Sequence, residues 1–359
     1  MMQLARREPN RGIVPHARPC LGPDEEAAAL RVLRSGRLAP GAEAARLEGL
    51  LARLSETADA VALSSGTVAL TLALRALGIG ERDLVALPSF ACAALLHAVR
   101  AAGAQPLICD IHPETLALDP ASIERRAPRP PAAVVVVHPF GMPAPLEAYR
   151  ARGLTVIEDC AQALGACDRR RPVGGRGDAA IFSFAPTKVV TCGGPGGALV
   201  SPRASVVSLA RDLATHDERP TDRARANALM GDLSAAIAAV QLGRLGEFRD
   251  RRAAIARRYD NAFPGAGARP PQRPPDTEPL TFRYLLRLPD AGGLIAALGR
   301  RGITARRPVH QPLHRLVGSP DPFPGTDAAY RELVSLPMSP ALTDEEIDKV
   351  IEEVGRCLP

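Results

Sequence analysis

The stretch FSFAPTKVVTCGGPGGALV (residues 182–200) joins two apolar, strand-like runs through a glycine-rich turn and carries one lysine, Lys188. Only two of the 45 basic residues are lysines, Lys188 and Lys349, and the others are arginines. A guanidinium stays protonated and cannot act as an amine nucleophile, so a required primary amine would resist replacement by arginine. Lys188 is therefore a candidate for covalent chemistry, although survival by chance stays open here. Lys349, in the amphipathic run TDEEIDKVIEEV, is interpreted as incidental.

Short apolar runs alternate with helical segments from about residue 25 onward, which is typical of a parallel α/β sheet with helices on both faces. Each run is bounded by Gly, Pro or Asp, as expected of strands buried on both sides. The runs 67–77 and 90–103 have the spacing of covering helices. The sequence predicts one large, mostly parallel, seven-stranded sheet with strands at 59–63, 83–88, 105–111, 132–140, 154–159, 178–184 and 197–201.

The pattern changes after residue 209. Residues 215–227 are charged and lack periodicity, so we predict a long loop of functional interest. One long helix is expected over 232–263, followed by a proline-rich connector at 264–279. Runs at 281–288, 291–302 and 344–354 indicate a smaller C-terminal α+β domain. We therefore expect a large domain of residues 1–245 and a second domain of residues 246–359.

The composition argues against several classes of protein. The formal charge is +6, but the basic pairs are scattered and only 3% of residues are aromatic, so nucleic-acid binding is not expected. No apolar run approaches the roughly 20 residues of a membrane span, and the N-terminus lacks the apolar core of a signal peptide. The seven cysteines form no CxxC pair and no regular framework, which favours a reducing, cytoplasmic location and offers no metal-ligand pattern.

The turn after the first expected strand is a candidate phosphate site. In SSGT (64–67) the chain turns through Gly66 into a helix expected to begin at Thr67. Free backbone N–H groups and the positive end of the helix dipole suit an anion there, and the Thr67 hydroxyl adds a donor. The alternative is that Gly66 only shapes the turn and Thr67 only caps the helix.

Three further candidates follow later strands, where ligands collect in open α/β sheets. Asp159 ends LTVIED and could hold a proton on a ring nitrogen, with Gln162 three residues on; it could equally cap a helix at 160–164. Ser183 ends AAIFSF and could donate to an anion, and Lys188 follows it. A phosphate cradle, a carboxylate for a ring nitrogen, a hydroxyl and a primary amine together match pyridoxal 5′-phosphate (PLP), which is held by a lysine as a Schiff base.

The order of these motifs resembles the DegT/StrS-type (DegT/DnrJ/EryC1/StrS) family of PLP-dependent sugar aminotransferases, within fold type I. The resemblance spans most of the chain. It rests on ALSSGTVALTLALRALGIG, LPSF, AGAQPLICDIHPETLALDP, VVVHPFGMPAPL, VIEDCAQALGA, GDAAIFSFAPTK, AAIAAVQLGRL and SLPMSPALTDEEIDKVIEEV.

The resemblance implies a role for each matching position. Lys188 would be the Schiff-base lysine and the base that moves protons, Asp159 the partner of the pyridine nitrogen, and Gln162 the neighbour of the ring hydroxyl. Asn227 would reach the phosphate from the other subunit, which implies a homodimer with shared active sites. The phosphate would be held by Gly66, Thr67, Val68 and Ser183.

The sequence also departs from the family pattern near the expected substrate mouth. Cys92 stands where the family usually places a ring over the cofactor, and a thiol cannot stack in that way. The usual tyrosine and arginine after the asparagine are Ala228 and Leu229, and the expected glycine-glutamate-glycine-glycine turn reads GGPGG. Because these departures lie near the expected substrate entrance, they affect the expected substrate more than the expected cofactor.

The expected activity is transfer of an amino group from glutamate or glutamine to a keto-sugar, possibly nucleotide-linked, or to a keto-cyclitol, in polysaccharide or secondary-metabolite biosynthesis. The alternatives are another PLP reaction, such as elimination or carbon–carbon bond formation, and a PLP-binding regulator without turnover. A nicotinamide-dependent dehydrogenase is disfavoured because no GxGxxG follows the first strand. His310 and His314 are expected to end a strand rather than to line the substrate pocket.

Overall fold

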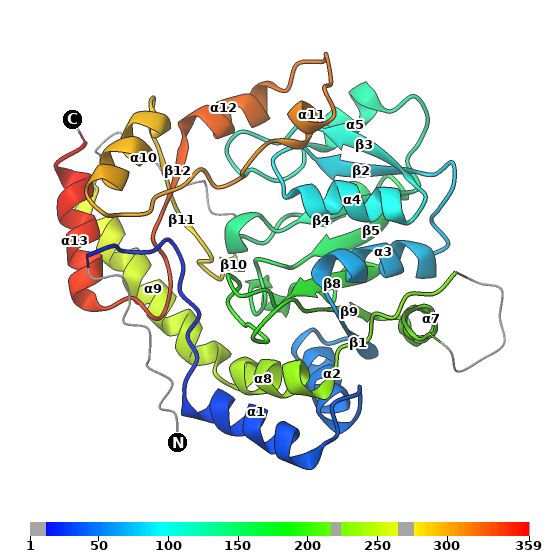
Figure 1. Cartoon of the computed structure of the whole chain (residues 1–359). Helices are drawn as coiled ribbons and strands as arrows, with labels where there is room; N and C mark the ends of the chain where they lie inside the picture. Colours follow the sequence, from blue (N-terminus) through cyan, green and yellow to red (C-terminus); the bar gives the residue numbers. More distant parts are fainter. Residues whose placement is uncertain (1–11, 217–223, 265–275, 359) are drawn as a thin grey trace.

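The computed structural model describes residues 12–216, 224–264 and 276–358. Its centre is a seven-stranded sheet in the order β1-β9-β8-β5-β4-β2-β3, with helices on both sides (Figure 1). The predicted sheet is confirmed, and its strands begin and end within a few residues of the expected positions. They are β1 (Asp59–Leu63), β2 (Leu84–Pro88), β3 (Gln105–Cys109), β4 (Ala133–Val137), β5 (Thr155–Asp159), β8 (Ala179–Ser183) and β9 (Gly197–Ser201).

The strand directions bring the ends of three strands to one edge. β2, β3, β4, β5 and β8 are parallel, whereas β9 is antiparallel to both β8 and β1. Residues 184–196 join β8 to β9 without a helix, so the chain turns back beside β8 instead of crossing over to a parallel position. Because β1 is consequently parallel to β8, the carboxyl ends of β1, β5 and β8 lie at the same edge of the sheet.

Helices bury both faces of the sheet, which explains why its strands are apolar throughout. One face is covered by α3 (Gly66–Ala76), α4 (Ala93–Ala101) and α7 (Ala204–Ala214). The other face is covered by α2 (Ala42–Leu54), α5 (Pro120–Arg126), α6 (Glu147–Arg150) and α8 (Asp232–Gly243). α1 (Pro23–Ser35) lies outside this layer and packs on α8 through Ala28 and Val32.

A smaller α+β unit follows, as the sequence predicted. It is built on an antiparallel pair of strands, β11 (Tyr284–Arg287) and β12 (Leu333–Leu336). Its helices are α9 (Leu245–Ala262), α10 (Ala291–Arg300), α11 (Leu313–Leu316), α12 (Pro324–Glu332) and α13 (Asp344–Gly355). A 3-10 turn, η1 (Pro139–Gly141), follows β4, and the short strands β6 (Cys167–Asp168), β7 (Arg171–Pro172) and β10 (Thr277–Glu278) form a separate small sheet.

Residues 14–18, near the start of the described chain, contact this smaller unit. Val14 forms a bridge with Ile303 and belongs to the apolar core of the C-terminal unit. Arg18 pairs with Glu346 of α13 at 2.6 Å. These contacts join residues that are far apart in the sequence, so no local sequence pattern indicates them.

The single helix expected over residues 232–263 is wrong, because α8 and α9 are separate helices that run in different directions (Figure 1). Arg244 interrupts them with φ −92° and ψ 5°. Gly243 precedes it, and glycine is a weak helix former. The Arg244 guanidinium donates to Glu25 of α1 at 2.9 Å and to Glu247 at 3.0 Å. The break therefore lets one side chain tie α1 to the start of α9.

Parts of two predicted loops lie outside the described residues, namely 217–223 and 265–275. The described rest of the first loop, residues 215–216 and 224–227, has no helix or strand, and the chain then returns to the sheet. There the N–H of Ser64 donates to the carbonyl of Ala228 at 2.8 Å, and the N–H of Met230 donates to that of Ala62 at 3.1 Å. No helix in the described part of the chain is long and apolar enough to cross a bilayer.

Candidate active site

A cavity of about 580 Å³ opens at the carboxyl ends of β1, β5 and β8. Val68 and Asn227, which the sequence also suggested, do not line this cavity. The side wall comes from residues 90–95 and from the C-terminal unit, including Phe282, Arg283 and His310. The other residues predicted from the sequence all line it, namely Gly66, Thr67, Cys92, Asp159, Gln162, Ser183 and Lys188.

The turn after β1 has free donors for an anion. α3 begins at Gly66, and its cap is Ser65, whose Oγ accepts from the N–H of Val68 at 3.2 Å. The interpretation of Thr67 as a cap is therefore wrong, and the N–H of Val68 is already used. In the described part of the chain the N–H groups of Gly66 and Thr67 have no acceptor. These two groups and the Thr67 hydroxyl suit a phosphate at the helix N-terminus.

The cradle depends on close packing between the turn and two strand ends. A Cβ added at Gly66 would lie 3.1 Å from the Cβ of Ser183, and one added at Gly197 would lie 2.4 Å from the N of Gly66. Only glycine at 197 lets the start of β9 approach the turn this closely. Ser183 is thereby held beside the free N–H groups, as a phosphate ligand would require.

Asp159 is buried, with 7% of its surface exposed, and it ends β5. One carboxylate oxygen accepts from the N–H of Ala161 at 2.9 Å, and the other has no partner among the described residues. Residues 161–165 form turns and no helix, so the alternative of a helix cap is wrong. Burial raises the pKa of Asp159, whereas the Ala161 N–H and the charge of Lys188 lower it, and the net direction is upward. A protonated ring nitrogen would supply the partner that the second oxygen lacks.

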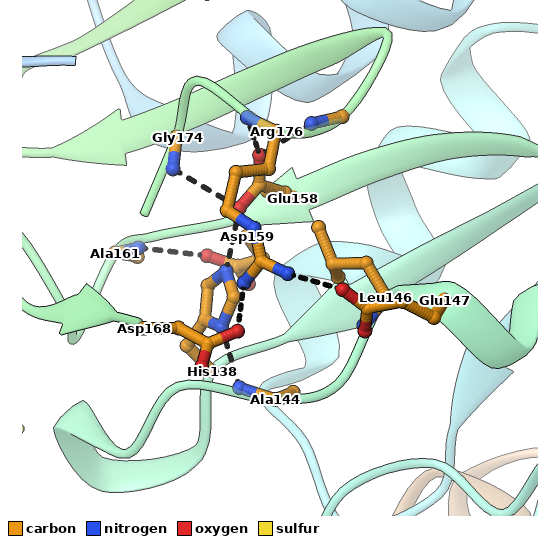
Figure 2. Close-up of polar contacts among 11 residues, drawn as sticks. His138, Ala144, Leu146, Glu147, Glu158, Asp159, Ala161, Asp168, Gly174 and Arg176 are labelled. Carbon is orange, nitrogen blue, oxygen red and sulfur yellow. Dashed lines mark hydrogen bonds and ion pairs between the residues drawn. The ribbon is translucent and has the colours of Figure 1, made fainter. Parts of the chain in front are cut away.

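Next to Asp159 in β5, the carboxylate of Glu158 anchors the strand (Figure 2). The Nδ1 of His138 accepts from the N–H of Ala144 at 2.9 Å, so its Nε2 carries the proton and donates to Glu158 at 3.0 Å. Glu158 also accepts from the N–H groups of Gly174 at 3.0 Å and Arg176 at 2.8 Å. Burial raises the pKa of Glu158, but these hydrogen bonds, led by that of His138, outweigh it and lower the pKa.

The same residues form a buried His138–Glu158–Cys160 group whose ligand atoms lie within 4.8 Å of one another. Both nitrogens of His138 and both oxygens of Glu158 already take part in hydrogen bonds. Arg176 extends the network by pairing with Asp168 and, at 2.7 Å, with Glu147. The arrangement is therefore a structural hydrogen-bond network that fixes the end of β5, and it leaves these atoms no lone pair for a metal.

Gln162 is oriented by a strained turn. Its Oε1 accepts from the N–H of Phe140 at 3.0 Å, so its NH₂ group points away from that N–H. Phe140 has φ 56°, a left-handed conformation that side chains rarely adopt. Because Gln162 lines the cavity, its amide can donate to a ring hydroxyl or oxyanion there.

Lys188 is half-buried, and its Nζ lies 5.5 Å from the ring centroid of Phe282. Burial lowers the pKa of Lys188, Asp159 and Cys92 raise it, and Arg283 lowers it, with a net downward direction. A lowered pKa increases the fraction of neutral amine, which is the form that bonds to a carbonyl carbon. Cys92 is exposed at the start of α4, and its side chain makes no capping hydrogen bond.

Some cavity-lining residues that the sequence analysis did not single out come from the C-terminal unit. Phe282 and Arg283 approach the cavity just before β11, and a charge beside the apolar run of that strand was the one available signal. The expectation that His310 and His314 end a strand is wrong. His310 lines the cavity in a bend, whereas His314 lies in α11 and its Nδ1 bonds the buried Oγ of Ser89 at 2.7 Å.

Comparison with known proteins shows the family of the chain. Residues 19–355 match the sequence model of the DegT/DnrJ/EryC1/StrS aminotransferase family. A dTDP-3-amino-3,4,6-trideoxy-alpha-D-glucose transaminase from Streptomyces venezuelae is 34% identical over 347 residues, covering 92% of this chain and 91% of that protein.

Two solved structures of aminotransferases are similar to this chain over nearly its whole length. DesV from S. venezuelae, in complex with a ketimine intermediate, has a TM-score of 0.87 at 34% identity and covers 93% of this chain and 94% of its own. The aminotransferase TlmJ from Streptoalloteichus hindustanus has a TM-score of 0.90 at 31% identity, with 96% and 98% covered.

We predict that Glu158→Gln destabilises the protein by about 1–3 kcal/mol at pH 7, because an amide NH₂ must then face at least one buried N–H donor. The pKa of Glu158 is lowered by folding, so its contribution is fully present above the ordinary value of 4.5 and is lost as the pH falls through the lower folded value. The difference from wild type should therefore shrink below pH 4.5. Thermal unfolding from pH 7 to pH 3 measures both effects.

The matched control is Glu114→Gln, which changes an exposed carboxylate in the same way. It should unfold like wild type over the whole range. Equal stability of Glu158→Gln and wild type at pH 7 would contradict the role assigned to Glu158.

Proposed function

The chain belongs to the DegT/DnrJ/EryC1/StrS aminotransferase family, and we propose that it transfers an amino group from glutamate or glutamine to a ketone on a sugar or cyclitol. It is a PLP-dependent aminotransferase. The observation that carries the proposal is the meeting, in one cavity, of the Lys188 amine, the buried Asp159 carboxylate and the free N–H groups of the 64–67 turn.

Each residue has one task in this proposal. Bound PLP supplies an electron sink that stabilises negative charge on the substrate carbon. Gly66, Thr67 and Ser183 hold its phosphate, and Asp159 keeps a proton on its ring nitrogen. The Lys188 amine removes the proton from the amine-bearing carbon of the donor and later returns a proton to the carbon that was the ketone of the acceptor. Because the pKa of Lys188 is lowered, its amine can accept the proton from the donor carbon and can then give a proton up to the acceptor carbon.

The acceptor class is supported by relatives and by the shape of the site. The S. venezuelae relative is named as a transaminase of a dTDP-linked aminosugar, which favours a nucleotide-linked keto-sugar here. Cys92 is exposed and lines the cavity where the family usually has a ring, and a thiol is smaller than a ring, so we propose that the acceptor side of the site differs there from the usual pattern. All seven cysteines are free, which agrees with the cytoplasmic location that we propose.

A homodimer with shared active sites is also part of the proposal. Asn227 is exposed and does not line the cavity of its own chain. It precedes Ala228, whose carbonyl accepts from the N–H of Ser64, so it lies at the edge of β1 near the phosphate turn. An exposed amide at that edge can reach the phosphate of a second copy related by two-fold symmetry.

We predict that Lys188→Arg abolishes covalent attachment of PLP and lowers amino transfer by on the order of 10³-fold or more, because a guanidinium retains the charge but cannot replace the amine. Borohydride reduction of the wild type, followed by mass spectrometry of the tryptic peptide 177–203, reads the attachment directly. The control, Lys349→Arg, changes the other lysine, which is half-buried, does not line the cavity and donates to the carbonyl of Gly12. Attachment and activity that survive in Lys188→Arg would refute the assignment.

The shared site predicts complementation between two defective variants. Homodimers of Lys188→Ala should be inactive, and those of Asn227→Ala should bind PLP weakly. Unfolding and refolding an equal mixture should restore about a quarter of the wild-type activity at limiting PLP, because half of the dimers then contain one intact site. If Asn227 acts within its own chain, no mixed dimer contains an intact site and the mixture stays as weak as its components.

A further inference from the structure

Arg283 is a charged side chain in the cavity wall that the reaction described above does not use. Its guanidinium carbon lies 5.3 Å from the ring centroid of Phe282, and the Nζ of Lys188 lies 5.5 Å from the same centroid. Both side chains line the cavity. The two side chains therefore share Phe282 as a neighbour, and the charge of Arg283 contributes to lowering the pKa of Lys188.

This guanidinium lacks a counter-ion. Its Nη1 contacts His16 Nε2 at 3.0 Å and Ser335 Oγ at 3.5 Å, and neither partner is an anion. Its Nε is buried without a hydrogen-bond partner, and no carboxylate of the described residues forms an ion pair with it. Burial, then Arg283 and Arg306, lower the pKa of His16 to about 3, so this ring is neutral and can accept the hydrogen bond.

Other buried or partly buried arginines reach a carboxylate or a backbone carbonyl, even where their Nε has no partner, as in Arg252. Arg211 pairs with Glu48 at 2.9 Å. Arg252 has no carboxylate either, but it donates to the carbonyls of Thr281, Phe282 and Met338. Burial, then Arg306, lower the pKa of Arg283 to about 10, which still leaves it cationic at neutral pH. A desolvated charge without a partner is unfavourable, so an anionic ligand in the cavity would stabilise it.

We propose that Arg283 binds a carboxylate of the amino donor and so selects amino acids as donors. The phosphate of PLP is accounted for by the 64–67 turn, so the anion that meets Arg283 belongs to a substrate. Every amino-acid donor carries a carboxylate on the carbon that bears its reacting amine, whereas the diphosphate of a nucleotide-linked keto-sugar is separated from its ketone by carbons of the sugar ring. The open edge of a guanidinium also matches a carboxylate through two parallel hydrogen bonds. This inference rests on the proposed transamination.

The test uses the holoenzyme and the variants Arg283→Gln and Arg283→Lys. In Arg283→Gln, kcat/KM for the donor that the wild type uses should fall about 10- to 100-fold, mostly through KM, as expected when a charge-assisted hydrogen bond is lost. The KM of the ketone acceptor should stay within about twofold, and Arg283→Lys should recover part of the loss because it keeps a point charge. Binding of glutarate, an unreactive dicarboxylate, should weaken by a similar factor in calorimetry.

The matched control is Arg306→Gln, which removes a neighbouring positive charge that does not line the cavity. It should leave donor KM and glutarate affinity within about twofold of wild type, which separates direct contact from a general field. A loss confined to the acceptor would assign the anion to a phosphate of that substrate and overturn the proposal. Unchanged kinetics in Arg283→Gln, equal losses for both substrates, or no glutarate binding by the wild type would also overturn it. Failure of the wild type to exchange amino groups with any amino acid would instead refute the proposed function.

Discussion

The site depends on a carboxylate and an amine that are placed together in a buried cavity at the ends of two neighbouring parallel strands. Burial raises the pKa of Asp159 and lowers the pKa of Lys188, while the attraction between their charges opposes both shifts. The burial effect prevails in each case, so the pair favours the neutral forms more than free side chains would. Binding of a cationic ring nitrogen restores charge to the carboxylate, and a neutral amine is free to form a bond. The cofactor would thus supply the positive charge that the buried Asp159 carboxylate lacks in the protein alone.

The fold holds this pair by packing rather than by flexible side chains. Glu158, adjacent to Asp159 in β5, receives hydrogen bonds from His138 and from the backbone of residues 174–177, so the strand end cannot shift without breaking a buried network (Figure 2). Gly197 allows the start of β9 to approach the 64–67 turn, which brings the anion cradle to Ser183. The antiparallel β9 follows from the short connection that carries Lys188. One segment of chain, residues 184–196, therefore accounts for both the direction of β9 and the position of the reactive amine.

The sequence predicted the elements whose signals are local. Seven apolar strands, the turn at Gly66, Asp159 and Lys188 all follow from composition and spacing within a few residues. It did not predict the break at Arg244, because that break depends on Glu25, over 200 residues away. It also missed Phe282, Arg283 and His310, which reach the cavity through the folding of the C-terminal unit onto the sheet. Thr67 lines the cavity, but the helix cap is Ser65, whose side chain accepts from the first-turn N–H of Val68.

The most direct test of the pairing of Asp159 with the ring nitrogen is nitrogen NMR of the holoenzyme loaded with PLP that is ¹⁵N-labelled in the ring. We expect the chemical shift of a protonated pyridine nitrogen across the neutral range in wild type. In Asp159→Asn, the shift should be that of an unprotonated nitrogen, because an amide cannot stabilise the ring N–H cation to the same degree. An unprotonated nitrogen in wild type, or the same shift in both proteins, would contradict the account.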